Sequence, residues 1–112
     1  MNTSLNARHC IHGAAALDDA AIASLLPQVP DWRVDDRKLV REFLFRDYHE
    51  TIEFVNALAF MVHREDHHPD LQVGYRRCTA SWTTHSAGHR LSENDFICAA
   101  KADALYVGRA GA

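Results

Sequence analysis

The sequence predicts an α+β fold: one four-stranded antiparallel sheet with helices packed on one face. Segments with the three- to four-residue apolar repeat of amphipathic helices alternate along the chain with pairs of short stretches in which apolar and polar residues alternate. In order they give α-β-β-α-β-β-α, and two hairpins joined by a helix most simply form a single antiparallel sheet. With 112 residues, the chain is long enough for one domain with a modest core.

The first helix and the first hairpin are predicted before residue 46. Asp18 or Asp19 is placed to cap a short helix through IASLL, which stops before Pro27. After Pro30, the stretches WRVDD and KLVREFLF are rich in aromatic and branched residues, and the polar DDRK between them is typical of a hairpin turn. Residues 1–15 are predicted to be a loose arm, residues 16–108 a single domain, and residues 109–112 a frayed end.

The central helix is predicted over residues 48–64. Ile52, Val55, Ala59 and Val62 recur at three- and four-residue steps, as on the apolar face of a helix. Phe54, Leu58 and Met61 widen this face. Pro69 pushes the residue before it out of the helical region, so this helix must end near residue 66 or 67.

The second hairpin consists of LQVGY and CTASWTTH. If Arg76 and Arg77 form a two-residue turn, Leu71 lies opposite Trp82 on an apolar face, and the same register brings His68 opposite His85. A turn centred on Gly74-Tyr75 is the alternative. We predict the first register, which gathers three histidines (67, 68 and 85) with Asp66 and Asp70 nearby.

The last helix begins with a capping box and ends at a glycine. Ser92 and Asp95 stand at the two positions of the box, and Gly108 stands at the expected stop. The box alone accounts for Asp95, so a role in a pocket would be additional.

Composition excludes several classes of function. The net charge is −3 with histidines neutral, which gives no electrostatic case for binding nucleic acid or an anionic membrane. The three cysteines (10, 78 and 98) form no CxxC pair, which favours reduced thiols. The amino-terminal stretch has no apolar signal region. We therefore expect a cytoplasmic protein without nucleic-acid or membrane partners.

The segment HREDHHPDL leaves three interpretations open. Three neutral imidazoles can hold a catalytic zinc, although adjacent histidines such as His67 and His68 seldom point the same way. Two imidazoles with a pKa near ~6.5 can instead divide the work of a general acid and a general base. The third interpretation is a polar loop of solvated side chains. Clustering of titratable groups favours a functional site over such a loop.

With these residues in place, the chain resembles the pterin-4a-carbinolamine dehydratases, close to their bacterial branch, from about Leu17 to Leu105. The motif is an ionisable residue, three spacers, His-His-Pro, five spacers, an aromatic, nine spacers, a histidine and a downstream aspartate. It is matched by His63, His67-His68-Pro69, Tyr75, His85 and Asp95. The stretches PDWRV, REFLFRDY and FVNALAFMVHREDHHPDL also resemble the family.

The resemblance implies dehydration of 4a-hydroxytetrahydropterin to quinonoid dihydropterin, which recycles the cofactor of aromatic amino acid hydroxylases. It also implies a homodimer or homotetramer that needs no metal or organic cofactor. By position, the implied catalytic residues are His67, His68 and His85, whose imidazoles protonate the departing 4a-hydroxyl and remove the N5 proton. The implied substrate-binding residues are Asp95, His63, Thr84, Asp66 and Pro69.

The chain departs from the family pattern at two places. The position of His63 is often glutamate in the family. In THSAGHRLSEND one extra residue, with His89 and Arg90, stands where the family often reads THxxGGL[ST]xxD, and that loop flanks the expected pocket. Two alternative functions stay open on the same fold: a non-catalytic binding or assembly partner, and a metal-dependent hydrolase built on the three imidazoles.

Overall fold

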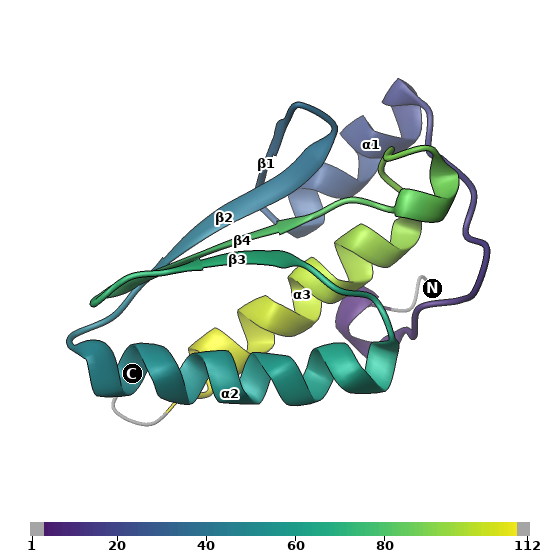
Figure 1. Cartoon of the computed structure of the whole chain (residues 1–112). Coiled ribbons are helices and arrows are strands. Elements are labelled where there is room, and N and C mark those ends of the chain that lie inside the picture. Colours follow the sequence, from purple (N-terminus) through teal and green to yellow (C-terminus); the bar gives the residue numbers. More distant parts are fainter. Residues whose placement is uncertain (1–3, 110–112) are drawn as a thin grey trace.

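The computed structural model describes residues 4–109 and shows helices packed against a four-stranded sheet (Figure 1). The elements are α1 (Asp19–Leu25), β1 (Arg33–Asp35), β2 (Lys38–Leu44), α2 (Tyr48–Glu65), β3 (Asp70–Val73), β4 (Arg77–Trp82) and α3 (Glu93–Val107). Short 3-10 turns lie at Leu5–Ala7 (η1), Leu26–Gln28 (η2) and His85–Ala87 (η3). This order confirms the predicted α+β class.

The sheet has the strand order β1-β2-β4-β3, and every neighbouring pair is antiparallel. The long helices α2 and α3 lie on one face of this sheet (Figure 1). The two predicted hairpins therefore join through β2 and β4, and the carboxyl end of α2 comes close to the end of β4.

The turn of the first hairpin is tight. Asp36 and Arg37 both have positive φ, 49° and 63°, between the paired residues Asp35 and Lys38. Two successive left-handed residues give a turn whose twist matches that of the flanking strands. The hairpin forms here although neither position is a glycine.

The second hairpin has a different register from the predicted one. Leu71 pairs with Ala80 and Val73 with Cys78, and Gly74 N donates to Arg77 O over 2.7 Å. The turn is therefore centred on residues 75 and 76, so the prediction of an Arg76-Arg77 turn is wrong by one residue and each predicted cross-strand pairing is wrong by two. Because side chains in a strand alternate with period two, this shift leaves each apolar residue on the same face.

Each helix end has a local cause in the sequence. Asp18 Oδ1 accepts from Ala21 N over 2.8 Å at the start of α1, and Asp47 Oδ1 accepts from Glu50 N over 2.8 Å at the start of α2. Helix α2 ends at Asp66, which has the left-handed φ of 53°. The capping box begins α3 as predicted.

Helix α2 is amphipathic. Phe54, Leu58 and Val62 are buried on one side, whereas Ala59 of the predicted apolar face and Phe60 are exposed. Within residues 4–109, no helix combines the length and the apolar character that crossing a bilayer requires.

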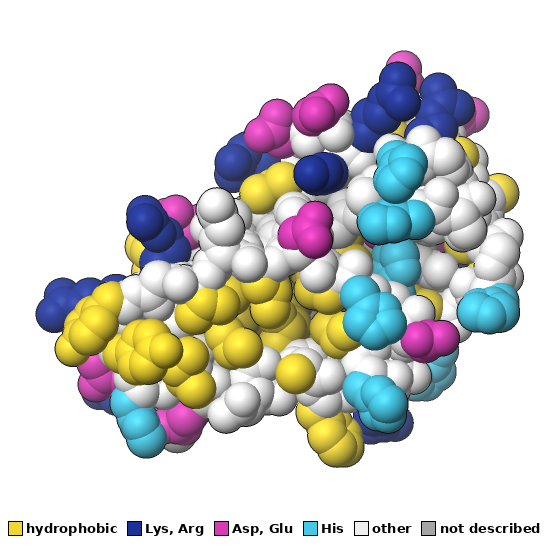
Figure 2. Space-filling view, in the orientation of Figure 1, with side chains coloured by type: hydrophobic (Ala, Val, Ile, Leu, Met, Phe, Trp, Pro, Cys, Tyr) yellow, Lys and Arg dark blue, Asp and Glu magenta, His cyan; other side chains and the backbone are white. Residues whose placement is uncertain are grey.

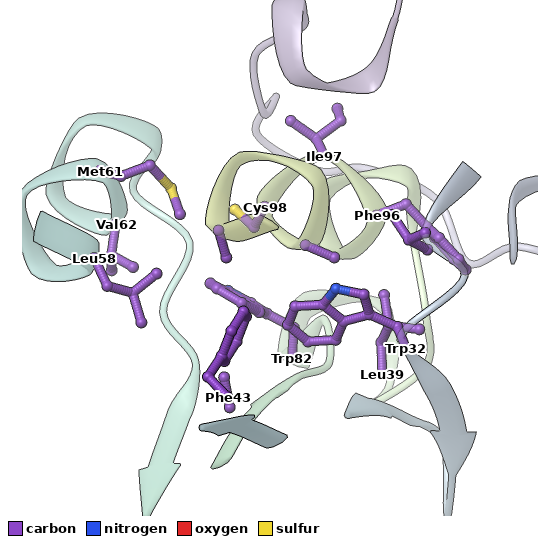
Figure 3. Close-up of a cluster of buried hydrophobic side chains, with 14 of the residues drawn as sticks. Trp32, Leu39, Phe43, Leu58, Met61, Val62, Trp82, Phe96, Ile97 and Cys98 are labelled. Carbon is purple, nitrogen blue, oxygen red and sulfur yellow. The ribbon is translucent and has the colours of Figure 1, made fainter. Parts of the chain in front are cut away.

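The core fills the space between the sheet and the two long helices (Figure 3). The rings of Trp32 and Trp82 are 5.8 Å apart between centroids, and those of Phe43 and Phe54 are 4.7 Å apart. Aromatic pairs at such spacings stabilise a core beyond the area that they bury. The other large buried residues of this core are Leu39, Leu58, Phe96 and Ile97.

The amino-terminal segment differs from the expected loose arm. Residues 1–3 lie outside the described part of the chain, but residues 4–14 run along α3 and the end of α2. Leu5 is buried in the core, Arg8 forms an ion pair with Glu93, and Lys101 Nζ donates to Asn6 O over 2.7 Å. These anchors are tertiary contacts, and the local sequence contains no periodic signal for them.

Candidate functional site

A cavity of about 280 Å³ opens at the end of the molecule where α2 finishes and the chain leaves β4. This volume is close to the lower end of the ~300–1,000 Å³ usual for small-molecule sites. Figure 2 shows histidine side chains gathered over this end of the molecule. The lining comprises Ile11, His12, Gly13, Asp66, His67, His68, Thr83, Thr84, His85, Ser86 and Asn94.

His67 and Asp95 form a hydrogen-bonded pair beside this cavity. His67 Nε2 lies 2.6 Å from Asp95 Oδ1, and the Asp95 side chain is fully buried. Because the other oxygen of Asp95 also accepts hydrogen bonds, we assign Nε2–H of His67 as the donor. The ring nitrogen not committed to Asp95 is then Nδ1.

The hydroxyl groups of Thr84 and Ser92 and the backbone N–H of Ser92 hold the Asp95 carboxylate through the oxygen that does not face His67. Thr84 Oγ1 and Ser92 N both donate to Asp95 Oδ2 over 2.8 Å. The Ser92 hydroxyl lies 2.7 Å from Thr84 Oγ1 and accepts from Asn94 N, so its own proton goes to Thr84. The capping box thus orients the carboxylate that orients His67, and Asp95 has both roles.

The backbone of His67 is held by the core. Asp66 ends α2 in a left-handed conformation, and Trp82 Nε1 donates to His67 O over 3.1 Å. Trp82 is fully buried, so this contact connects the position of His67 to the packing of the sheet.

His68 and His85 line the same cavity as His67, from the loop before β3 and from η3. Both are exposed. The ring of His89 lies 4.6 Å from that of His85 between centroids. The loop that departs from the family pattern therefore contacts one of the predicted catalytic histidines directly.

The remaining predicted residues occupy different places. Asp66 and Thr84 line the cavity, whereas His63 and Pro69 are not among its lining residues. His63 is exposed near the end of α2.

Sequence reasoning missed six lining residues: Ile11, His12, Gly13, Thr83, Ser86 and Asn94. The first three belong to the segment expected to be loose. Asn94 stands inside the capping box, where no local signal separates it from an ordinary residue of a first helical turn.

Metal binding was one of the interpretations left open by the sequence. Among the described residues, no three histidine, cysteine, aspartate or glutamate side chains are grouped in a way that could hold a metal ion.

Two further ionisable groups, Glu65 and Cys98, lie against Cys10 of the amino-terminal segment. Burial raises the pKa of Glu65, but the hydrogen bond from Cys10 N, the His9 ring and the nearby Lys101 outweigh it, and the net pKa is lowered. The Cys98 thiol has a raised pKa because it is hydrogen-bonded to Cys10, whose sulfur is 3.5 Å away, and because it is buried. Glu65 is thus a carboxylate at neutral pH and Cys98 a protonated thiol.

A four-stranded antiparallel sheet with helices on one face is the fold that the family resemblance implies. The model of the family described as "Pterin 4 alpha carbinolamine dehydratase" matches residues 15–105. The chain belongs to this family. The matched range is close to the domain predicted over residues 16–108.

Two bacterial proteins show how far the similarity extends. A protein of Xanthomonas oryzae pv. oryzae (strain MAFF 311018) is 50% identical over 107 residues, which cover 91% of this chain and 90% of the relative. One of Stenotrophomonas maltophilia (strain K279a) is 55% identical over 91 residues, covering 80% and 78% of the two chains. Both carry the name pterin-4-alpha-carbinolamine dehydratase, given provisionally.

Two solved structures have the same fold. A transcriptional coactivator/pterin dehydratase from Brucella melitensis aligns with a TM-score of 0.77 and 26% identity, over 81% of this chain and 98% of its own. A pterin dehydratase-like protein described as a RuBisCO assembly factor in the alpha-carboxysome aligns with a TM-score of 0.58 and 25% identity, over 70% and 89%.

Proposed function

We propose that this protein dehydrates 4a-hydroxytetrahydropterin to quinonoid dihydropterin and so recycles the pterin cofactor of aromatic amino acid hydroxylases. The observation that carries the proposal is the cavity lined by His67, His68 and His85, one of which is held by a buried carboxylate. Family membership supplies the substrate class.

The reaction needs one proton delivered and one removed. An acid protonates the 4a-hydroxyl, the C4a–O bond breaks with loss of water, and a base takes the N5 proton as the C4a–N5 double bond forms. Neutral imidazole and imidazolium are both populated near pH 7, so histidines can perform both steps. In the proposal the three cavity histidines share these roles and Asp95 holds His67 in one orientation.

The other predicted contacts follow from their positions. Asp66 and Thr84 line the cavity, and we propose that Asp66 contacts the pterin while Thr84 acts through Asp95. His63 and Pro69 do not line it, so their proposed influence is on the shape of the segment that carries His67 and His68.

We further propose that the protein is cytoplasmic and forms a homodimer or homotetramer. Support for an oligomer comes from exposed large apolar side chains at the end of the sheet opposite the cavity, namely Leu44, Tyr48, Val73 and Tyr75. The Tyr48 and Tyr75 rings stack with centroids 5.9 Å apart. Light scattering on the purified protein measures the number of subunits.

The test is a dehydratase assay on the wild type and on His67→Ala, His68→Ala and His85→Ala, with a metal chelator present throughout. We expect the wild type to accelerate dehydration and the variants to lose roughly 10²- to 10⁴-fold in kcat, the usual contribution of a positioned acid or base. His49→Ala is the matched control, because His49 is an exposed histidine paired with Glu53 at the other end of α2. A wild type without activity would refute the proposal and favour a binding or assembly role.

A further inference from the structure

The amino-terminal segment forms one side of the cavity. Ile11, His12 and Gly13 line it together with the histidines of the loop between α2 and β3 and of η3. These residues precede residue 15, where the match to the family model begins. These three residues, called here the amino-terminal wall of the cavity, therefore lie outside the range that matches the family model.

Specific contacts hold this wall in position. Ile11 N donates to Asn94 Oδ1 over 3.0 Å, and Asn94 Nδ2 donates back to Ile11 O over 2.8 Å. Asn94 is buried and belongs to the same helical turn as Asp95, so one turn of α3 positions both the wall and the carboxylate behind His67.

One residue earlier, Cys10 N donates to Glu65 Oε1 over 2.8 Å. The Glu65 side chain is only 5% exposed, and His9 and Lys101 also contact it. A buried carboxylate that accepts a backbone N–H fixes this part of the segment firmly. The backbone at residues 10 and 11 is thus anchored on both neighbouring helices.

The side chain of Ile11 is not used by these anchors. It is 66% exposed at the rim of a cavity whose other side chains are mostly polar. His12 is also exposed there, and Gly13 adopts the left-handed φ of 71° that turns the chain back toward the buried Ala14. The fold therefore places the apolar side chain of Ile11 and the hydrogen-bonding side chain of His12 at the cavity, and neither takes part in the contacts that anchor the segment.

We propose that Ile11 and His12 are substrate-contact residues, with Ile11 packing on the flat face of the bound pterin ring and His12 hydrogen-bonding to its polar edge. The inference rests on the proposed function for the identity of the ligand. A flat heterocycle with a polar perimeter needs both kinds of contact, and sites for small ligands usually combine an apolar surface with a few placed polar groups.

The test compares steady-state kinetics of Ile11→Ala and His12→Ala with the wild type. Covering most of an isoleucine side chain is worth about a 5- to 30-fold change in affinity, so KM for Ile11→Ala should rise by that factor while kcat stays within about twofold. Loss of one hydrogen bond should raise KM for His12→Ala roughly 3- to 10-fold. Ile11→Val and His12→Gln should restore most of the loss.

Two controls separate contact from structure. Val107→Ala removes a similarly exposed aliphatic side chain at the end of α3, and His49→Ala removes an exposed histidine; neither change should alter KM. The rate at which Cys10 reacts with a thiol reagent reports whether the segment stays docked, since its sulfur lies against Cys98. Faster labelling together with an equal fall in kcat would mean a structural role and overturn the proposal.

The outcomes also separate this inference from the proposed function. An active wild type with unchanged KM in both alanine variants overturns the inference and leaves the dehydratase in place. If the wild type is inactive, the affinities of the wild type and the two alanine variants for 7,8-dihydrobiopterin are compared instead. Weaker binding by both variants than by the wild type supports a substrate contact at Ile11 and His12. Equal affinities, or no binding by the wild type, overturn the inference.

Discussion

Replacing Asp95 by asparagine tests how the site is organised, because it removes one charge and almost no volume. The asparagine oxygen can still accept from Ser92 N and Thr84 Oγ1, so the helix cap is kept. Its NH₂ group then faces Nε2–H of His67, and two donors cannot bond to each other. His67 must move its proton to Nδ1 or turn away.

The magnitude follows from these contacts. One charge-assisted hydrogen bond is lost in a fully buried place, which costs about 1.5–3 kcal/mol of unfolding free energy. With an m value of roughly 1–1.5 kcal/mol/M in urea for a small domain, the midpoint should fall by about 1–3 M. The wrong tautomer should lower kcat about 10²- to 10⁴-fold, since a comparable change in a carboxylate–histidine pair costs up to ~10⁴.

Urea unfolding and the dehydratase assay measure the two effects on the same preparation. The matched control is Asp47→Asn, since Asp47 caps α2 through Glu50 N at the end of that helix away from His67. We expect this control to keep its activity. If Asp95→Asn folds normally and retains half or more of the wild-type kcat, the His67–Asp95 pair does not organise the site and the reasoning fails.

Three further predictions concern the support of the site. Trp82→Phe removes the donor to His67 O, so it should lower both kcat and the free energy of unfolding, the latter by about 1–3 kcal/mol; unchanged kinetics would disconnect this contact from catalysis. The pKa of Glu65 is lowered in the folded protein, so its ionised form stabilises the fold at pH values above 4.5, the pKa of this group in the unfolded chain. The stability difference between the wild type and Glu65→Gln, followed by urea unfolding against pH, should therefore disappear as pH falls through the folded pKa; a pH-independent difference would contradict this. Burial raises the pKa of Cys78 to about 11, so at pH 8 a thiol reagent should label Cys10 in the folded protein and leave Cys78 unlabelled until unfolding, as mass spectrometry would show.

Local signals in the sequence predicted the element boundaries well. Asp18 and the Ser92 box are found as caps, and α2 ends at Asp66, three residues before Pro69. A cap is a contact between residues two or three positions apart, so the sequence contains both partners side by side.

The register of the second hairpin illustrates the limit of such reasoning. A shift of two residues keeps Leu71, Ala80 and Trp82 on the same face, so the apolar pattern cannot distinguish the two registers. The turn is centred on Tyr75 and Arg76, and neither residue is a glycine or another residue type that would mark a turn in the sequence.

The sequence by itself determined the α+β class, the faces of the strands, the helix caps and the histidines to examine, because all of these depend on side-chain type at short, periodic spacings. Only the tertiary structure decided that the carboxylate of Asp95 meets His67, 28 positions away, and that Ile11 lies against Asn94, 83 positions away. Such contacts arise when the whole core packs, and no local pattern encodes which distant backbone will lie beside a given side chain.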